Sequence, residues 1–337
     1  MQCLSYGRII LLLKRQRKLI KFLVKVDSLL KGLRERLYTK TYTSDEKAGG
    51  LAKEWAQRLG LKEGIAVTVG AFDAHMKAVG AEIKEKTFVK ILGTSCCDIA
   101  VVTRKEVSNK LVEGICGQVD GSVIPGMIGL EAGQSSFGDV YAWFKDILSW
   151  PIENLLTENK IVKKEIIEKL KEEIEDKIIQ RLSEEASKLN PEDTGLLALD
   201  WLNGRRTPYA DQKLKGAIIG LTLGTTAPKI FRALVEATAF GAKAIIEHFQ
   251  EEGIEIENVV GIGGISQKSP FIMNVLSNVL DMPVKVAKSE QAVALGAAMF
   301  GTIAAGLYKS IPDAQKNIGS GFIKTYYPFC YFASLHY

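Results

Sequence analysis

Short apolar runs separated by glycines dominate the chain from residue 64 onward. Runs of this kind cover residues 65–69, 87–92, 97–102, 122–128, 259–262 and 284–286. Apolar runs of four to eight residues that are bounded by Gly or Pro are typical of β-strands. We therefore predict that these segments form a sheet, including the run around Pro125.

Longer segments alternate with these runs and carry apolar residues at three- and four-residue steps. This spacing predicts helices over residues 135–148, 228–251, 270–280 and 291–307. The first of them is rich in aromatic residues, which we expect in the core: Phe137, Tyr141, Trp143 and Phe144. Strand–turn–helix repeats predict an α/β fold with helices layered on a sheet.

Two segments are more charged than the rest. Residues 151–190 combine Lys and Glu with regularly spaced Ile and Leu, which predicts an amphipathic helical insertion with a solvated face. Residues 8–37 have the pattern of a basic helix. Such a helix suits a membrane surface, but a surface helix resting on a domain is the interpretation we favour, and a foreign start of the reading frame is a third.

Length and composition bound the function without naming it. The chain has 337 residues, 47% of them apolar, and a net charge of +5, which fits a globular protein of about two domains. Basic and aromatic residues do not interleave, so we expect no nucleic-acid partner. The apolar run at residues 9–13 is far shorter than the ~20 residues that cross a bilayer, so we expect no membrane partner either. Five cysteines without a C-x-x-C pair indicate reduced thiols in a cytoplasmic protein.

A lone carboxylate follows the first predicted strand. Asp73 comes after an apolar run and a glycine, so we expect it in a loop near a strand end, where α/β sheets bind their ligands. An ionised carboxylate there can accept the proton of a substrate hydroxyl. Local sequence alone favours a turn or capping aspartate instead. His75 beside it is interpreted as a structural residue, because no second His lies at ligand spacing.

Glycine turns follow two of the other predicted strands. Gly93 and Thr94 begin one turn, and its N–H and hydroxyl groups are suited to holding a phosphate. Gly263 and Gly264 form the other turn, which opens a helix and is a suitable seat for a nucleotide. The second turn departs from the dinucleotide-binding fingerprint because Ser266 replaces its third glycine.

Two residues around the first aromatic helix are further candidates. Glu131 lies just before the predicted start at Ser135, where it is able to cap the helix or to accept hydrogen bonds from a polyol. Gly138 lies inside the predicted helix, where glycine costs about 1 kcal/mol relative to alanine. That cost suggests the close approach of another helix or of a ligand.

Taken together, these pieces resemble the C-terminal portion of the FGGY family of carbohydrate kinases over residues 28–326. The most specific elements are Asp73-Ala74-His75 and Glu131-Ala132-Gly133-Gln134. The resemblance is also carried by Lys47-Ala48-Gly49-Gly50-Leu51, Val69-Gly70-Ala71-Phe72, Ile124-Pro125-Gly126, Leu197-Ala198-Leu199-Asp200-Trp201, Glu236-Ala237-Thr238-Ala239-Phe240-Gly241, Gly263-Gly264 through Lys268-Ser269-Pro270, and Glu290-Gln291-Ala292.

The resemblance implies an actin-like ATPase (ribonuclease H-like) domain, the C-terminal half of a two-domain sugar kinase. It implies a small sugar and ATP as substrates, Mg²⁺ as cofactor and no protein metal ligand within this chain. Asp73 would be the catalytic base and a sugar contact, and Glu131 a second sugar contact. The nucleotide would contact Gly93, Thr94, Gly138, Gly264 and Lys268. The implied reaction is phosphorylation of a ketopentose, ribulose above all; xylulose or glycerol is the alternative substrate.

The ends of the chain depart from the family pattern. The first phosphate turn of the family, Asp-x-Gly-Thr, does not occur here. We therefore expect a non-family basic segment at 1–27, a remnant of domain one and a linker at 28–63, the family's C-terminal domain at 64–326 and an atypical tail at 327–337. A chain so truncated would be nearly inactive alone. The alternative function is a non-catalytic nucleotide-binding module or one part of a split enzyme. The partner would then be a second copy of this chain or a separately encoded N-terminal half.

Overall fold

The computed structural model describes residues 21–36, 40–107, 110–156, 158, 161–190, 192 and 194–329. Most of the predicted basic segment and tail, with Cys3 and Cys330, therefore lie outside the described residues. Within the predicted helix at 8–37, residues 21–26 are helical, and two short 3-10 turns follow, η1 (Ser28–Leu30) and η2 (Arg34–Arg36).

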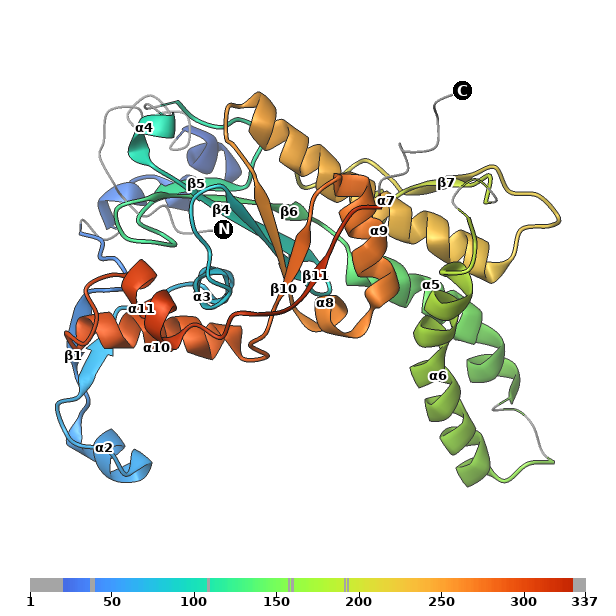
Figure 1. Ribbon diagram of the computed structural model, residues 1–337, viewed down its shortest axis with the longest axis horizontal. Helices are drawn as coiled ribbons and strands as arrows, with labels where there is room; N and C mark the ends of the chain where they lie inside the picture. Colours follow the sequence, from blue (N-terminus) through green and yellow to red (C-terminus); the bar gives the residue numbers. More distant parts are fainter. Residues whose placement is uncertain are drawn as a thin grey trace.

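A mixed sheet forms the centre of the described chain, with seven strands in the order β11-β10-β9-β3-β4-β6-β5 (Figure 1). Its strands are β3 (Thr87–Leu92), β4 (Cys96–Val102), β5 (Gly117–Asp120), β6 (Ile128–Gln134), β9 (Asn258–Ile262), β10 (Val284–Ala287) and β11 (Phe322–Tyr326). β3, β9 and β10 are parallel, and the other pairs are antiparallel. Because β3 and β9 are parallel neighbours, Leu92 and Ile262 end at the same edge of the sheet.

Helices cover both faces of this sheet. One face packs against α5 (Gly138–Pro151), α7 (Ala227–Glu251) and α9 (Pro270–Leu280), with α6 (Lys164–Ala186) joining the same core. The other face packs against α3 (Asp73–Gly80), α10 (Ala292–Ala304) and α11 (Ile311–Ile318). The short helices α4 (Arg104–Val107) and α8 (Gly264–Lys268) lie in connections. The predicted α/β layering is therefore confirmed.

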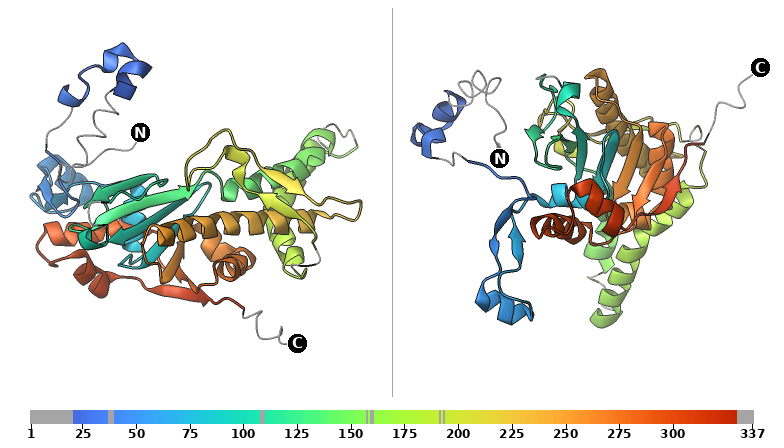
Figure 2. Two further views of the ribbon diagram at one scale, coloured as in Figure 1. Left: turned by 90° about the horizontal axis from the view of Figure 1, so that it is seen from above. Right: turned by 60° about the vertical axis from the view of Figure 1, so that its left-hand side comes forward.

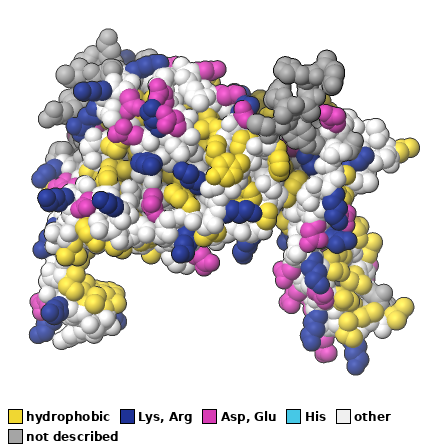
Figure 3. All heavy atoms as spheres, in the orientation of Figure 1, with side chains coloured by type: hydrophobic (Ala, Val, Ile, Leu, Met, Phe, Trp, Pro, Cys, Tyr) yellow, Lys and Arg dark blue, Asp and Glu magenta, His cyan; other side chains and the backbone are white. Residues whose placement is uncertain are grey.

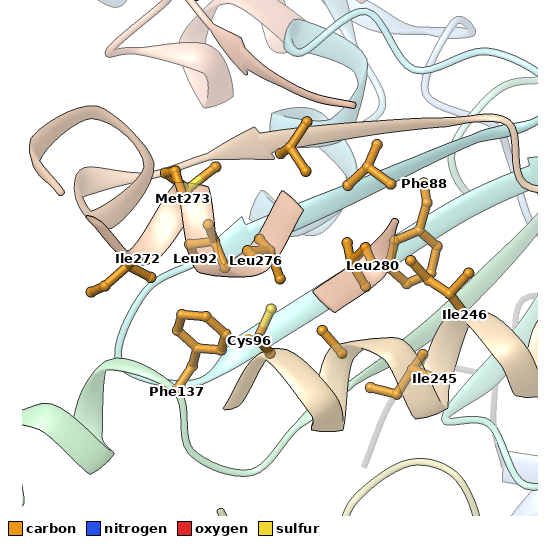
Figure 4. Packing of buried hydrophobic residues seen from close by; sticks show 14 of the residues in the cluster. Phe88, Leu92, Cys96, Phe137, Ile245, Ile246, Ile272, Met273, Leu276 and Leu280 are labelled. Carbon is orange, nitrogen blue, oxygen red and sulfur yellow. The ribbon is translucent and has the colours of Figure 1, made fainter. Parts of the chain in front are cut away.

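Strand alternation divides the core between the two faces. In β3, Phe88 and Leu92 belong to the cluster under α7 and α9, whereas Val89 and Ile91 belong to the cluster under α3 and α10. Figure 4 shows Phe88 and Leu92 among residues of α7 and α9 such as Ile246 and Leu276. Each large apolar side chain buried in this way contributes about 1.5–3 kcal/mol to the free energy of folding. The packed core therefore holds the strand ends and their turns in fixed positions.

Two parts of the chain project from this body. One is an arm made of β1 (Lys47–Gly50), α2 (Lys53–Leu59) and β2 (Ala66–Thr68), which stands away from the sheet (Figure 2). Because β1 and β2 pair, the expected domain boundary between residues 63 and 64 falls inside this hairpin. The other projection is formed by α5, the π-helical turn η3 (Ile152–Leu156) and α6. Figure 3 shows apolar side chains gathered on both projections.

A two-stranded sheet, β7 (Leu197–Leu199) with β8 (Ala217–Ile219), and the 3-10 turn η5 (Trp201–Asn203) follow the projecting helices. The predicted insertion at 151–190 is helical over Lys164–Ala186, with Ile167, Leu182 and Ala186 buried. Its acidic and basic residues form exposed pairs four residues apart, for example Lys177 with Glu173. Such pairs contribute only a few tenths of a kcal/mol, so its apolar stripe holds this helix in place.

The structure corrects three local predictions. Residues 122–127 of the run 122–128 form a turn, not a strand, because Pro125 lacks an N–H and Gly121 and Gly126 have positive φ. The flanking strands are β5, which ends at Asp120, and β6, which begins at Ile128. The aromatic helix begins at Gly138 instead of Ser135. Trp143 is 38% exposed, while the three other aromatic residues of that segment are buried.

Candidate functional site

The turn Gly93–Ser95 joins β3 to β4 at the edge of the sheet, and its residues are exposed. The start of α5 holds it in place. The carbonyl oxygen of Thr94 accepts hydrogen bonds from the N–H groups of Phe137 and Asp139, both at 3.1 Å. These hydrogen bonds fix the backbone of the turn. A turn that binds a phosphate through its N–H groups needs such a fixed backbone.

Gly138 is the first residue of α5, not an interior one, and it approaches the same turn. Its N–H donates to the Gly93 carbonyl oxygen at 3.0 Å, and an added Cβ would lie 2.6 Å from that oxygen. The close approach that the sequence suggested is therefore made by this backbone turn, and Cδ1 of Ile265 in α8 lies 3.2 Å from the same Cβ position.

The second glycine turn packs against the end of β3. Gly263 has φ +117°, a backbone conformation that residues with a side chain rarely adopt. An added Cβ would lie 2.3 Å from the Leu92 carbonyl oxygen. Gly264 begins α8, is exposed and has free space where a Cβ would stand. Lys268, at the end of α8, is exposed as well. The tertiary structure thus brings the predicted residues Gly93, Gly138 and Gly264 to one edge.

A pocket of about 250 Å³ opens at this edge. Residues of the second glycine turn, α8 and α10 line it together with one residue of α3: Lys77, Ile262, Gly263, Gly264, Gln267, Lys268, Glu290 and Ala292. Side chains four residues apart lie on one face of a helix. Asp73 therefore shares a face of α3 with the pocket residue Lys77.

Asp73 is exposed at the first position of α3, where a loop was expected. One carboxylate oxygen accepts a hydrogen bond from the N–H of Ala74 at 2.9 Å, and the positive end of the helix dipole favours its charge. Tight packing fixes α3 itself, because an added Cβ on Gly296 of α10 would lie 1.9 Å from the Met76 carbonyl oxygen. The carboxylate is accessible and its helix is held firmly.

Glu131 lies in the middle of β6 and not at a helix start, so it caps no helix. Its carboxylate is nearly buried and lies 3.1 Å from Nη2 of Arg206 and 3.6 Å from Nε2 of His75. His75 also packs edge-on against Phe72. These contacts agree with the interpretation of His75 as a structural residue, because its ring packs between Phe72 and the Glu131 carboxylate.

Sequence reasoning missed Arg206, which none of the predicted strands, helices or glycine turns includes. Its guanidinium Nε donates to the Sγ of Cys116 at 3.1 Å, beside Glu131. Burial and the Glu131 carboxylate together raise the pKa of Cys97, so this neighbouring thiol stays neutral. Arg206 and Glu131 are 75 residues apart in the chain, and no local pattern predicts that pairing.

The described residues include three cysteines. Cys96, Cys97 and Cys116, the described cysteines, are free thiols. Within the described ranges, no three His, Cys, Asp or Glu side chains come together as a metal-binding group would require. The helices of the same ranges include none with the length and apolarity of a membrane span.

Comparison with known proteins defines the class. The profile of the FGGY family of carbohydrate kinases, C-terminal domain, matches residues 88–305, and this chain belongs to that family. Ribulokinase of Vibrio parahaemolyticus is 47% identical to it over 307 residues, which are 91% of this chain and 53% of the relative. Ribulokinase of Halalkalibacterium halodurans is 40% identical over 292 residues, which are 84% of this chain and 48% of the relative.

Solved structures confirm the fold class. A ligand-bound xylulose kinase from Lactobacillus acidophilus superimposes with a TM-score of 0.68 at 18% identity, over 90% of this chain and 56% of that one. Xylulose kinase from Rhodospirillum rubrum gives a TM-score of 0.67 at 20% identity, over 86% of this chain and 52% of that one. The fold is that of the C-terminal, actin-like ATPase domain of a sugar kinase. The chain spans about half the length of these relatives.

Proposed function

We propose that this domain takes part in the ATP-dependent phosphorylation of a ketopentose, with ribulose as the substrate. One observation supports this above all others. The exposed Asp73 carboxylate lies on the same face of α3 as Lys77, and Lys77 lines a pocket together with the Gly263–Gly264 turn. The similar chains named ribulokinase support the choice of sugar. Xylulose and glycerol remain the alternative substrates, because kinases for both share the fold.

In this proposal Asp73 is the general base. The sugar hydroxyl oxygen bonds to the terminal phosphorus of ATP, the bond to the ADP oxygen breaks, and the hydroxyl proton passes to the Asp73 carboxylate. Such a base typically supplies a factor of ~10²–10⁴ in rate. The N–H groups of Gly93 and Thr94 would hold the phosphates, with Gly138 behind them. Gly264 and Lys268 would border the adenosine.

Glu131 would accept hydrogen bonds from sugar hydroxyls. Its carboxylate keeps one edge on Arg206, so its orientation is set before the sugar arrives. A preorganised acceptor contributes more to binding than a mobile one, because less side-chain entropy is lost.

Magnesium would arrive with the nucleotide. The ion would be bound chiefly by phosphates and water. Bound in that way, Mg²⁺ neutralises charge on the phosphate oxygens.

The remaining half of the relatives would complete the sugar pocket, supplied in the same protein or as a separate chain. A cytoplasmic location belongs to this proposal. The arm of β1, α2 and β2 supports the need for a partner, since it presents a hollow of about 410 Å³ lined by apolar residues such as Trp55 and Leu59. A nucleotide-binding module without catalysis is the second candidate, because the glycine turns assemble within this chain alone.

ADP release separates these functions. The chain is joined to the N-terminal half of the Vibrio parahaemolyticus relative and assayed with ribulose, xylulose and glycerol. We expect turnover on ribulose that Asp73→Asn lowers at least ~10²-fold, with ADP binding intact. Asp281→Asn is the control, because Asp281 is an exposed residue at the end of α9 in a conformation that Asn also adopts. Unchanged turnover in Asp73→Asn would refute the assigned base.

A further inference from the structure

A lysine is buried completely inside the sheet, close to the candidate site. Lys90 of β3 has 0% of its surface exposed, and so has Asp98, its cross-strand partner in β4. The Lys90 ammonium donates to both Asp98 carboxylate oxygens, at 3.0 and 3.2 Å, and to Oε1 of Gln134 at 2.9 Å. An ammonium has three N–H donors, so all of them are used.

The network continues from Gln134 to two other parts of the fold. Its amide nitrogen donates to Oδ2 of Asp200 at 2.8 Å and to the carbonyl oxygen of Thr238 in α7 at 2.9 Å. Gly241, one turn further along α7, leaves room for this junction, since an added Cβ would lie 2.6 Å from both the Gln134 amide and the Asp200 carboxylate. One buried junction therefore joins β3, β4, β6, α7 and the segment after β7.

Stability alone does not account for a charged junction of this kind. Burial by itself lowers the pKa of Lys90, but Asp98 and Cys96 together more than offset it, and the net pKa lies above the usual value. The lysine therefore stays charged. Replacing a buried ion pair by apolar residues of similar volume is often neutral or stabilising. What a buried polar junction adds instead is a single preferred arrangement.

The position of the junction indicates which arrangement it sets. Lys90 and Asp98 face each other across the hairpin whose tip is the turn Gly93–Ser95. Gln134 ends β6, immediately before the segment whose N–H groups hold that turn. Asp200 precedes η5 and the segment that carries Arg206 and Thr207, and Oγ1 of Thr207 accepts a hydrogen bond from the N–H of Gly133 at 3.2 Å.

We propose that Lys90, Asp98 and Gln134 are positioning residues. They hold the turn Gly93–Ser95 and the segment that carries Arg206 and Thr207 in one fixed arrangement. They touch neither substrate; they act through the backbone of Gly93–Ser95 and through Asp200. This inference rests on the proposed function in one respect only: the proposed function makes the ATP phosphates the ligand of the turn Gly93–Ser95.

Amide hydrogen exchange in the ligand-free chain tests the positioning role directly. The double variant Lys90→Met/Asp98→Leu replaces the pair by apolar residues, and Gln134→Met is a second variant that keeps the ion pair. In both we expect exchange at Phe137, Gly138 and Asp139, whose N–H groups hold the turn, to become about tenfold faster than global unfolding accounts for. The control is Ile246→Val, a buried change in α7 outside the junction. Exchange that changes no more than in the control would overturn the proposal.

Titration with ADP then separates the inference from the function it rests on. We expect the same variants to bind ADP about tenfold more weakly than the unaltered chain, and Ile246→Val to bind it equally. Equal ADP affinity in chains whose turn exchanges faster would overturn the link between the junction and the nucleotide. If the unaltered chain binds no ADP, the nucleotide assignment fails, while the exchange result still decides whether the junction positions the turn.

Discussion

The two sides of the candidate site are built from different materials. The side proposed to hold the phosphates consists of backbone: the turns at Gly93 and Gly263 and the first residue of α5 lie so close that an added methyl group at Gly138 or Gly263 would overlap a carbonyl oxygen. The acidic side consists of side chains: an exposed Asp73, and a Glu131 that Arg206 and His75 hold.

This difference determines how each side can fail. A site made of backbone is sensitive to added side-chain volume, because the turns are fixed to the sheet and cannot move to make room. A side-chain site is sensitive to charge, because removing one partner leaves a largely buried ion with less opposite charge beside it. The same binding edge therefore combines a rigid part and a part that single charge changes can adjust.

The largest expected effect is on the backbone side. Gly263→Ala places a methyl group 2.3 Å from the Leu92 carbonyl oxygen at φ +117°. We expect a loss of about 3 kcal/mol or more in the free energy of unfolding, from strain and overlap together. Urea unfolding measures it, and a loss below about 1 kcal/mol would show that the two turns are free to separate.

On the side-chain side, Arg206→Met should have the next largest effect. It leaves the nearly buried Glu131 carboxylate without its closest cation, and we expect a loss of about 2 kcal/mol. Arg181→Met is the matched control, because Arg181 of α6 is 68% exposed and its ion pairs contribute at most a few tenths of a kcal/mol. Equal losses in the two variants, again by urea unfolding, would contradict the special role of Arg206.

Gly264→Ala sharpens the comparison between volume and binding. The site of its Cβ is open, so the fold should be unaffected, but a methyl group there would intrude where the nucleotide is proposed to lie. We expect about tenfold weaker ADP binding by calorimetry, equivalent to about 1.4 kcal/mol. Gly301→Ala in α10, whose added Cβ would meet only a Thr68 methyl at 4.0 Å, should bind ADP normally. Unaltered affinity in Gly264→Ala would move the nucleotide away from this turn.

The smallest effect concerns Asp200. Burial raises the pKa of this carboxyl group, and the hydrogen bond from Gln134 opposes that rise only in part. The ionised group is thus less stable in the folded chain than in the unfolded one. Asp200→Asn should raise the thermal midpoint slightly at pH 7, and the gain should disappear below the ordinary value of 3.8, where both states are protonated. A gain that persists at low pH would point to a cause other than ionisation.

Much of the fold was predictable because its signals are local. The strand at 87–92 and the helices near 228–251 and 270–280 follow from apolar periodicity and agree with β3, α7 and α9. The buried turn at Ile124 defeated the same reasoning, since an apolar run that fills a turn has the composition of a strand. β1, α2 and α3 went unpredicted because their short segments carry weak patterns.

The candidate site divides along the same line. The sequence by itself determined where glycines follow strands and where a lone carboxylate follows an apolar run, because backbone sterics act over a few residues. Only the tertiary structure decided that Gly93, Gly138 and Gly263 meet, that Arg206 neutralises Glu131, and that Lys90 is buried against Asp98 and Gln134. The physical reason is that these contacts depend on the order and direction of strands in the sheet, which no local pattern encodes.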